Sequence, residues 1–252
     1  MDLELRGKRA IVTGGSRGIG KAIALQLARE GVDLVIAARN KDALIATAHE
    51  IATSTGQRVI PLVVDTGDET SVNELVRLAV SELGGIDILV NNAALPGGIS
   101  TAVRLEQIID DEVLADLNIK VVGYLRTARA VAPNLVKNGW GRIINVGGLA
   151  IRKTGRPVAT LRNVGVAAIT KNLADELGPK GINVIAVHPG ATRTERTKPE
   201  SEKDLAHGVS IGRIVDASEV ADVVAFLASP RSVAINGDAI SVGGGSLGSI
   251  YY

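Results

Sequence analysis

A glycine-rich stretch, TGGSRGIG at residues 13–20, is the first part of this sequence whose residue types and spacing point to chemistry. Its glycines Gly14, Gly18 and Gly20 stand between an apolar β-branched run and a run with helical periodicity. Glycine lets the backbone turn tightly and approach a pyrophosphate, and the N-terminus of the following helix presents free N–H groups. Many turns carry glycine for steric reasons alone, but this strand–turn–helix setting favours nucleotide binding.

The second apolar run, DLVIAA at 33–38, is followed directly by Arg39. A protein that binds NAD usually carries an acidic residue near this point, which binds the ribose 2′-hydroxyl. This sequence has none, and offers Arg39 together with Arg17 of the glycine-rich stretch. Two guanidinium groups suit a 2′-phosphate, which they can hold through paired charged hydrogen bonds. The alternative is two solvated surface arginines. We expect the cofactor to be NADP(H).

Two further apolar runs end in residues that suit the rest of a nucleotide. Asp65 ends the third run, where its carboxylate can accept a hydrogen bond from an adenine amino group or can begin a helix. The fourth run ends in NNAA at 91–94, whose Asn side chains can tie neighbouring loops together. The small residues of this segment leave room for a ribose.

These residues need a scaffold, and the hydrophobic pattern predicts one. Short β-branched runs predict strands at 9–13, 33–38, 58–65, 86–93, 142–146, 182–188 and 239–242. Helical periodicity predicts helices at 19–31, 41–56, 68–85, 112–138, 158–179 and 217–229. This alternation favours an α/β fold with a doubly wound parallel sheet of about seven strands and helices on both faces. Ligands of such sheets bind beyond the carboxyl ends of the strands. Pro61 within the third strand indicates an edge position or a local irregularity. No linker interrupts the pattern, so we expect one domain over residues 1–252.

Composition excludes several classes of function. The formal net charge of +1 gives no reason to expect nucleic acid or an acidic membrane as a partner. The absence of cysteine excludes disulfides, zinc–thiolate sites and thiol nucleophiles, and we expect no metal site. No apolar run is long enough to cross a bilayer, and the N-terminus has no apolar core of signal length. We expect a cytoplasmic protein.

Together the motifs resemble those of the short-chain dehydrogenase/reductase family in its common single-domain form. The resemblance rests on TGGSRGIG (13–20), DTGD (65–68), NNAA (91–94), Asn118, GRIINV (141–146), HPGATRT (188–194), IGRIVDASEVADVVAFLAS (211–229) and the ING and ISVGGG segments within 235–245. It implies a Rossmann-type sheet, a nicotinamide cofactor, a small-molecule substrate or ligand, and a homodimer or homotetramer. The cofactor-binding residues that it implies are Gly14, Ser16, Arg17, Gly18, Ile19, Gly20, Arg39, Asp65, Thr66, Asn92, Ala93 and Thr194.

The residues that carry the family's chemistry are mostly absent. The family uses a Ser, a Tyr, a Lys and an Asn, with the Tyr and Lys spaced Y-x-x-x-K on one helix face. Counted without gaps from GRIINV, the Ser position holds Gly148, the Tyr position Leu161 and the Lys position Gly165, while Asn118 is retained. We expect Leu161 to make the catalytic wall apolar and the two glycines to leave space beside it.

Other proton donors are few. The three tyrosines, Tyr124, Tyr251 and Tyr252, are far in sequence from the helix that should carry the Tyr. His188 ends the sixth predicted strand, and its ordinary pKa of about 6.5 suits acid–base work, although its place before Pro189 and Gly190 favours a packed strand-end residue. His207, in a segment that this family uses as a lid over the substrate, is a weaker candidate.

Several arginines and a lysine lie near the same helix. Arg162 follows Leu161 and projects about 100° round the helix, so we expect it to face elsewhere. Arg152, Lys153 and Arg156 form a basic loop that can attract an anionic ligand or can simply be solvated.

Two interpretations of the function follow. One is an NADP-dependent oxidoreductase with a non-standard proton source such as water, the substrate or His188. The other is an inactive nucleotide-binding protein with a regulatory or scaffold role. A lyase or isomerase that uses the emptied pocket is a third possibility. An enzyme is possible because hydride transfer depends on how the nicotinamide is oriented more than on the Tyr. It is favoured because the cofactor-binding residues remain whole.

Overall fold

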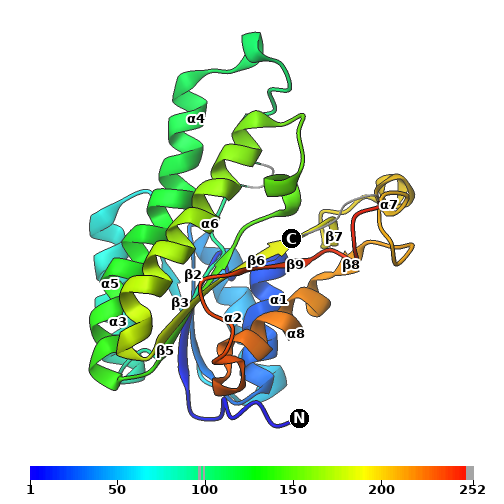
Figure 1. Ribbon diagram of the computed structural model, residues 1–252. Coiled ribbons are helices and arrows are strands. Elements are labelled where there is room, and N and C mark those ends of the chain that lie inside the picture. The colour runs from blue at the N-terminus through cyan, green and yellow to red at the C-terminus, as the bar shows by residue number, and fades with distance from the viewer. Residues whose placement is uncertain (96–97, 99, 248–252) are drawn as a thin grey trace.

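A seven-stranded parallel sheet forms the centre of the protein, as a computed structural model shows (Figure 1). The structure describes residues 1–95, 98 and 100–247, so Tyr251 and Tyr252 lie outside the described residues. The strand order is β3-β2-β1-β4-β5-β6-β9. The strands are β1 (Arg9–Thr13), β2 (Asp33–Ala38), β3 (Val59–Val63), β4 (Ile88–Asn91), β5 (Gly141–Val146), β6 (Ile182–Pro189) and β9 (Ala239–Val242). The expected doubly wound sheet is confirmed.

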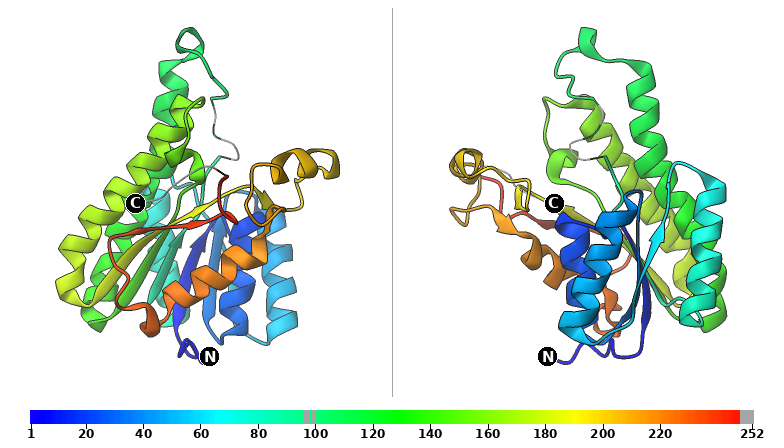
Figure 2. Two further views of the ribbon diagram at one scale, coloured as in Figure 1. Left: turned by 45° about the vertical axis from the view of Figure 1, so that its right-hand side comes forward. Right: turned by 180° about the vertical axis from the view of Figure 1, so that it is seen from behind.

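Helices cover both faces of this sheet (Figures 1 and 2). One face carries α1 (Gly18–Arg29), α2 (Lys41–Thr55) and α8 (Ala217–Ala228). The other carries α3 (Glu69–Leu83), α5 (Gly123–Asn138) and α6 (Pro157–Leu177). Each layer has its own apolar core, because the strands send side chains alternately to the two faces. The cores consist mainly of Ala, Val, Ile and Leu, which suits a parallel sheet buried on both sides.

The position of Pro61 follows from the strand order. Proline has no N–H to donate, so it is tolerated where one side of a strand has no partner. Strand β3 is the edge strand and pairs only with β2, where Pro61 lies opposite Ile36. The expectation of an edge position is confirmed.

The strand order reverses between β1 and β4, and polar side chains join the two strands there. The hydroxyl of Thr13 accepts hydrogen bonds from the backbone N–H groups of Asn92 and Ala93, at 3.0 and 3.1 Å. The Asn92 side chain donates to the carbonyl oxygens of Thr13 and Gly14, both at 3.2 Å. The end of β4 therefore holds the start of the glycine-rich loop in place, at the edge of the sheet where ligands of this architecture bind.

The predicted helix at 112–138 is divided in the structure. Helix α4 (Asp110–Leu117) is followed by one wide π-helical turn, Asn118–Val122, and then by α5. A π turn accommodates an extra residue, and such turns are frequent at functional sites. Here the wide turn carries Lys120, whose side chain is buried.

The sequence pattern also missed three short elements beyond β6. They are α7 (Pro199–Ala206) and the two-residue strands β7 (Thr192–Arg193) and β8 (Val215–Asp216), which pair with each other. This part of the chain projects from the body of the protein (Figure 2). Among the described residues, no helix combines the length and apolar character needed to cross a membrane.

Candidate active site

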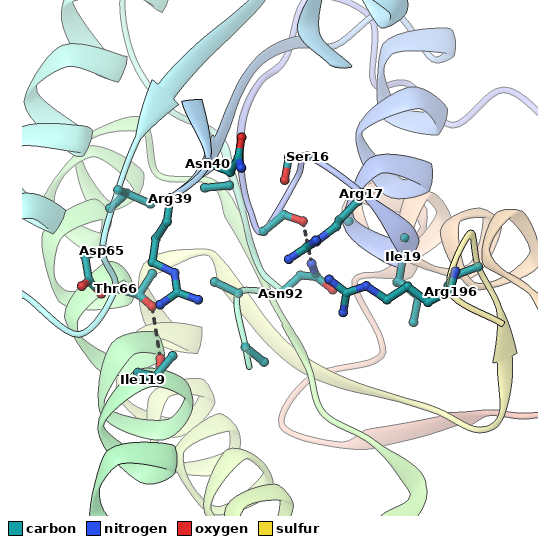
Figure 3. A pocket seen from close by; sticks show the side chains of 18 of the residues that line it. Ser16, Arg17, Ile19, Arg39, Asn40, Asp65, Thr66, Asn92, Ile119 and Arg196 are labelled. Atoms are coloured by element: carbon teal, nitrogen blue, oxygen red, sulfur yellow. Dashed lines mark hydrogen bonds between the residues drawn. The ribbon is translucent and has the colours of Figure 1, made fainter. Parts of the chain in front are cut away.

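A pocket of about 350 Å³ lies at the carboxyl ends of β1, β2, β3 and β4 (Figure 3). It brings together every residue that the sequence pointed to for cofactor binding, since its lining includes Gly14, Ser16, Arg17, Gly18, Ile19, Gly20, Arg39, Asp65, Thr66, Asn92, Ala93 and Thr194. The sequence analysis did not identify Asn40, Ile119, Glu195 and Arg196, which also line it. The residues come from six separate segments, so one ligand can contact all of them only because the sheet aligns the strand ends.

The glycine-rich loop is shaped for close approach. Gly18 has a φ of +55°, a conformation that residues with a side chain rarely adopt. A Cβ placed on Gly20 would lie 2.2 Å from the carbonyl oxygen of Gly14. Both positions therefore require glycine. The N–H groups of the loop at the start of α1 suit the pyrophosphate of a dinucleotide.

Positive charge surrounds this loop. The side chains of Arg17, Arg39 and Arg196 extend toward the pocket from three different segments (Figure 3). Asp65 lies at the same pocket, where its carboxylate accepts from the N–H of Gly67 at 2.8 Å. Asp68, not Asp65, begins α3, since its carboxylate accepts from Thr70. The pocket thus offers cations for phosphates and a carboxylate at the end of β3.

A second cleft, of about 520 Å³, lies at the carboxyl ends of β5 and β6. Gly148 follows β5 and lines this cleft together with Ala159, Arg162 and Asn163 of α6. Its remaining lining comes from the loops after β5, β6 and β9 and from the segment around α7, and consists of Gly147, Leu149, Ala150, Lys153, Thr154, Arg156, Pro189, Gly190, Ala191, Leu205, Gly208, Val209, Gly243 and Ser246. No Asp or Glu occurs among the described residues that line it, so the cleft is basic.

Comparisons with known proteins agree with a nucleotide-binding α/β fold. Residues 14–246 match a sequence family described as enoyl-(acyl carrier protein) reductase. The 3-oxoacyl-acyl-carrier-protein reductase FabG of Pseudomonas aeruginosa is 35% identical over 248 residues, which cover 96% of this chain and 98% of that protein.

The chain belongs to the short-chain dehydrogenase/reductase family.

Solved structures of this family are closely similar over the whole chain. L-sorbose reductase from Gluconobacter frateurii, in complex with NADPH and L-sorbose, is 29% identical with a TM-score of 0.91, covering 99% of this chain and 100% of that one. A short-chain dehydrogenase from Burkholderia cenocepacia in complex with NADP is 36% identical with a TM-score of 0.86, covering 96% and 98%. The chain therefore has the family's NAD(P)-binding fold.

The expected orientation of Leu161 and Gly165 is wrong. Leu161 is 50% exposed and does not line the cleft; it lines a mostly apolar groove with Ile108, Asp110, Val113, Leu114, Pro157 and Val158. A Cβ on Gly165 would meet Val121 at 3.0 Å, so this glycine packs against the turn before α5. The residues of α6 that line the cleft are Ala159, Arg162 and Asn163, and Ala159 and Asn163 have the same four-residue spacing as Leu161 and Gly165, two positions earlier.

The expected orientation of Arg162 is also wrong. Its side chain is buried, lines the cleft and donates to both carboxylate oxygens of Asp116, at 2.8 and 3.0 Å. The count from GRIINV is offset by two residues on α6, and this offset explains why Arg162 faces the cleft. One residue advances a helix by about 100°, so the side chain next to Leu161 faces inward when Leu161 faces outward.

Asn118 does not lie at the cleft, contrary to its expected catalytic role. Its side-chain oxygen accepts from Arg126 at 2.7 Å, and its amide nitrogen lies 3.4 Å from the carbonyl oxygen of Gly67. These contacts hold it against the loop after β3. The wide turn that begins at Asn118 instead directs Lys120 toward the residues of the cleft.

His188 is fully buried, and its structural contacts give it little scope for proton transfer. Its Nδ1 accepts from the backbone N–H of Gly148 at 3.1 Å, so a neutral ring carries its proton on Nε2. Burial and the positive charges of Lys120 and Arg152 lower the pKa of His188 to about 4. At neutral pH the ring is uncharged and serves as an acceptor that fixes the loop at Gly148. A catalytic role for it stays a prediction without structural support.

The tyrosine among the described residues is unavailable for catalysis. Tyr124 is buried on α5, and its hydroxyl donates to the carbonyl oxygen of Val146 at 2.9 Å. Burial raises its pKa well above the ordinary value. His207 lies exposed at the end of α7, outside the lining of the cleft.

Lys120 is the functional candidate that the sequence analysis missed. It is 4% exposed, and its ammonium donates to the carbonyl oxygen of Gly147 at 3.0 Å and to the side-chain oxygen of Asn163 at 3.1 Å. Burial, with the charge of Arg162, lowers its pKa to about 7, although Asp116 acts in the opposite direction. The sequence gives no sign that this lysine is buried, because it lies in a predicted amphipathic helix. The wide π-helical turn at 118–122 directs its side chain inward.

Glu195 occupies part of the nucleotide pocket. Its carboxylate accepts from the N–H of Gly18 at 3.1 Å, at the N-terminus of α1 where a pyrophosphate oxygen would bind. A bound dinucleotide would have to displace this carboxylate, because both are anions that use the same donor.

Replacing Glu195 with Ala should therefore strengthen NADPH binding. A hydrogen bond of this kind contributes about 0.5–1.5 kcal/mol, so the dissociation constant should fall about two- to tenfold. Fluorescence titration with NADPH measures this, and Glu200→Ala on α7 is the matched control, which should bind as the wild type does. Unchanged or weaker binding by Glu195→Ala would show that this carboxylate does not compete with the cofactor.

Proposed function

We propose that this protein is a cytoplasmic NADP(H)-dependent oxidoreductase that reduces activated carbonyl compounds without the Ser, Tyr and Lys of its family. The observation that supports the proposal is the pocket at one edge of the sheet, whose lining includes all twelve residues that we expect to bind the cofactor. The names of the relatives support reduction, since FabG is a reductase and L-sorbose reductase is solved with NADPH.

The preference for NADP(H) rests on charge. Arg17 and Arg39 lie at the pocket, and no acidic residue stands at the end of β2 to bind a free 2′-hydroxyl. A 2′-phosphate suits two guanidinium groups, which bind its oxygens through charge-assisted hydrogen bonds. A solved relative from Brucella melitensis is complexed with NADH, so the family alone does not decide the cofactor.

The catalytic positions, in this proposal, hold Gly148, Ala159 and Asn163. None of these side chains can donate a proton as a Tyr hydroxyl does, and general acid catalysis typically contributes about 10²–10⁴-fold. NADPH, when bound, supplies a hydride to the substrate carbon. The chain binds and orients the substrate, and water supplies the proton to its oxygen. The substrate must then be electron-poor enough to accept a hydride with little acid assistance.

The basic cleft adds a second constraint on the substrate. Lys153 and Arg156 line it in addition to Arg162, and no described acidic side chain does. A cationic acceptor would be repelled here, whereas an anionic one would be attracted. A ketone activated by a neighbouring carboxylate meets both requirements.

Replacing Arg39 with Ala should reduce the preference for NADPH over NADH by about tenfold or more, because one charge-assisted contact to the 2′-phosphate is lost. Fluorescence titrations with both nucleotides measure the ratio, and Arg29→Ala on the exposed end of α1 is the control. Equal affinities in the wild type, or an unchanged ratio in Arg39→Ala, would contradict this assignment.

The wild-type protein should oxidise NADPH with benzoylformate faster than with its methyl ester, and slowest with acetophenone. The carboxylate should raise kcat/KM about tenfold over the ester, and the double change Lys153→Gln, Arg156→Gln should remove that difference. Absorbance of NADPH follows the reaction. If NADPH binds but no acceptor is reduced, the protein is a nucleotide-binding protein without turnover, and the proposed function is wrong.

We also propose that the protein is a homodimer or homotetramer. Large apolar side chains are exposed on neighbouring helices, with Leu114 on α4, Leu125 and Val136 on α5, and Leu161 and Val164 on α6. Light scattering should give a mass at least twice the 26.1 kDa of one chain. The double change Leu114→Glu, Leu161→Glu should shift the protein toward monomer, because it places charge in the apolar groove. A wild-type mass of one chain would contradict the proposal.

A further inference from the structure

A hydrogen-bonded chain of two side chains lies behind the cleft and ends at an open space. Lys120 donates to the side-chain oxygen of Asn163, and Asn163 is itself only 2% exposed. The amide nitrogen of Asn163 donates to the carbonyl oxygen of Ala159, one turn earlier on α6, at 2.8 Å. These partners identify the oxygen and the nitrogen of the Asn163 amide, because an ammonium can only donate a hydrogen bond and a carbonyl oxygen can only accept one.

The open space is at Gly148. A Cβ placed on this glycine would lie 3.4 Å from the amide nitrogen and 3.5 Å from the amide oxygen of Asn163, so a side chain here would cover this amide. Glycine leaves the volume free, and both Gly148 and Asn163 line the cleft. The amide nitrogen carries two N–H groups, and the bond to Ala159 uses one of them.

We propose that the second N–H of Asn163 binds the carbonyl oxygen of the substrate in the space beside Gly148, and that Lys120 positions this amide. The inference rests on the proposed function, since it assumes that a carbonyl is reduced in this cleft. Asn163 is then a catalytic residue, and Lys120 is a positioning residue that places a positive charge one hydrogen bond behind it.

The chemistry is that of a developing oxyanion. As the substrate carbon gains the hydride that NADPH supplies, the π bond to oxygen breaks and its electron pair remains on oxygen. The alkoxide accepts a hydrogen bond from the N–H of Asn163 and then takes a proton from water, which gives the alcohol and hydroxide. Donors fixed before the reaction stabilise such a charge without reorganising. The Lys120 ammonium polarises the amide and so strengthens the donor.

The charge on Lys120 depends on its surroundings. The groups that face it are Asp116 of α4, Arg162 of α6 and the neutral His188 of β6. Burial and the charge of Arg162 lower the pKa of Lys120 to about 7, although Asp116 acts in the opposite direction. The ammonium is present below this pH and is lost above it, so activity should fall as the pH rises through this range.

Three variants test the inference with NADPH and benzoylformate. Asn163→Ala should lower kcat about 10²-fold or more while NADPH binding stays within about twofold, because only the oxyanion donor is lost. Lys120→Met should lower kcat about tenfold and remove the fall in activity near neutral pH. Lys120→Arg, whose charge does not titrate, should restore kcat and keep it to higher pH. Lys137→Met, an exposed lysine near the end of α5, is the matched control and should behave as the wild type.

A measurement without turnover tests the pair on its own. In the wild type, the side-chain amide resonances of Asn163 should shift between about pH 5 and about pH 9, with a midpoint near that of Lys120. Asn163→Asp assigns these signals, and Lys120→Met should abolish the shift.

The outcomes separate the inference from the proposed function. Turnover by the wild type with unchanged kcat in Asn163→Ala overturns the inference and leaves the proposed function intact. Amide resonances that do not titrate overturn the positioning role of Lys120, even if the ketone is reduced. A wild type that reduces no acceptor overturns the proposed function instead.

Discussion

The hydrogen bonds between the ends of β1 and β4 are the interaction on which the rest of the site depends. The Thr13 hydroxyl accepts from two backbone N–H groups of the segment after β4, and Asn92 donates back to Thr13 and Gly14. These contacts close the point where the strand order reverses. They also set the glycine-rich loop against the N-terminus of α1, so that the nucleotide pocket is formed by the backbone before any ligand binds. The two arginines can specify the nucleotide only because this loop fixes its phosphates.

Most of the nucleotide half could be predicted from the sequence. Strands end where β-branched runs end, and parallel strands place their carboxyl ends at one edge, so Gly14, Arg39, Asp65 and Asn92 had to converge. The contribution of the 192–197 segment was only partly predictable. Thr194 was expected at the pocket, but Glu195 and Arg196 follow from the small β7–β8 pair, and strands of two residues leave no periodic signal.

The catalytic half was harder to predict, for a reason of geometry. The loop between β5 and α6 carries no periodicity that fixes its length, so counting along the sequence from Gly148 does not fix which residues of α6 face the cleft. A shift of two residues turns a helix by about 200°. That rotation exchanges the faces, so Leu161 lies on the outer surface while Ala159 and Asn163 lie at the cleft. The wide turn after α4 has a similar effect, because it separates Asn118 from the cleft and buries Lys120.

Two buried basic residues, Lys120 and Arg162, lie beside the cleft, and in our proposal they take the place of the family's tyrosine and lysine. Arg162 is neutralised by Asp116, whereas Lys120 has only neutral hydrogen-bond acceptors, Gly147 and Asn163. Burying a lysine in this way is costly, and such groups recur at functional sites because their protonation can respond to a ligand. The chain has the NAD(P)-binding fold of its family, and in our proposal the changes in chemistry lie at Gly148 after β5, on α6 and in the turn before α5.

The central claim is that this scaffold reduces a substrate without a tyrosine. The most direct test compares NADPH oxidation with benzoylformate by the wild type and by the double variant Tyr251→Phe, Tyr252→Phe, since Tyr124 is buried and bonded to Val146. The account predicts measurable and equal rates for the two proteins. A rate that collapses in the double variant, or no oxidation by either protein, would contradict it.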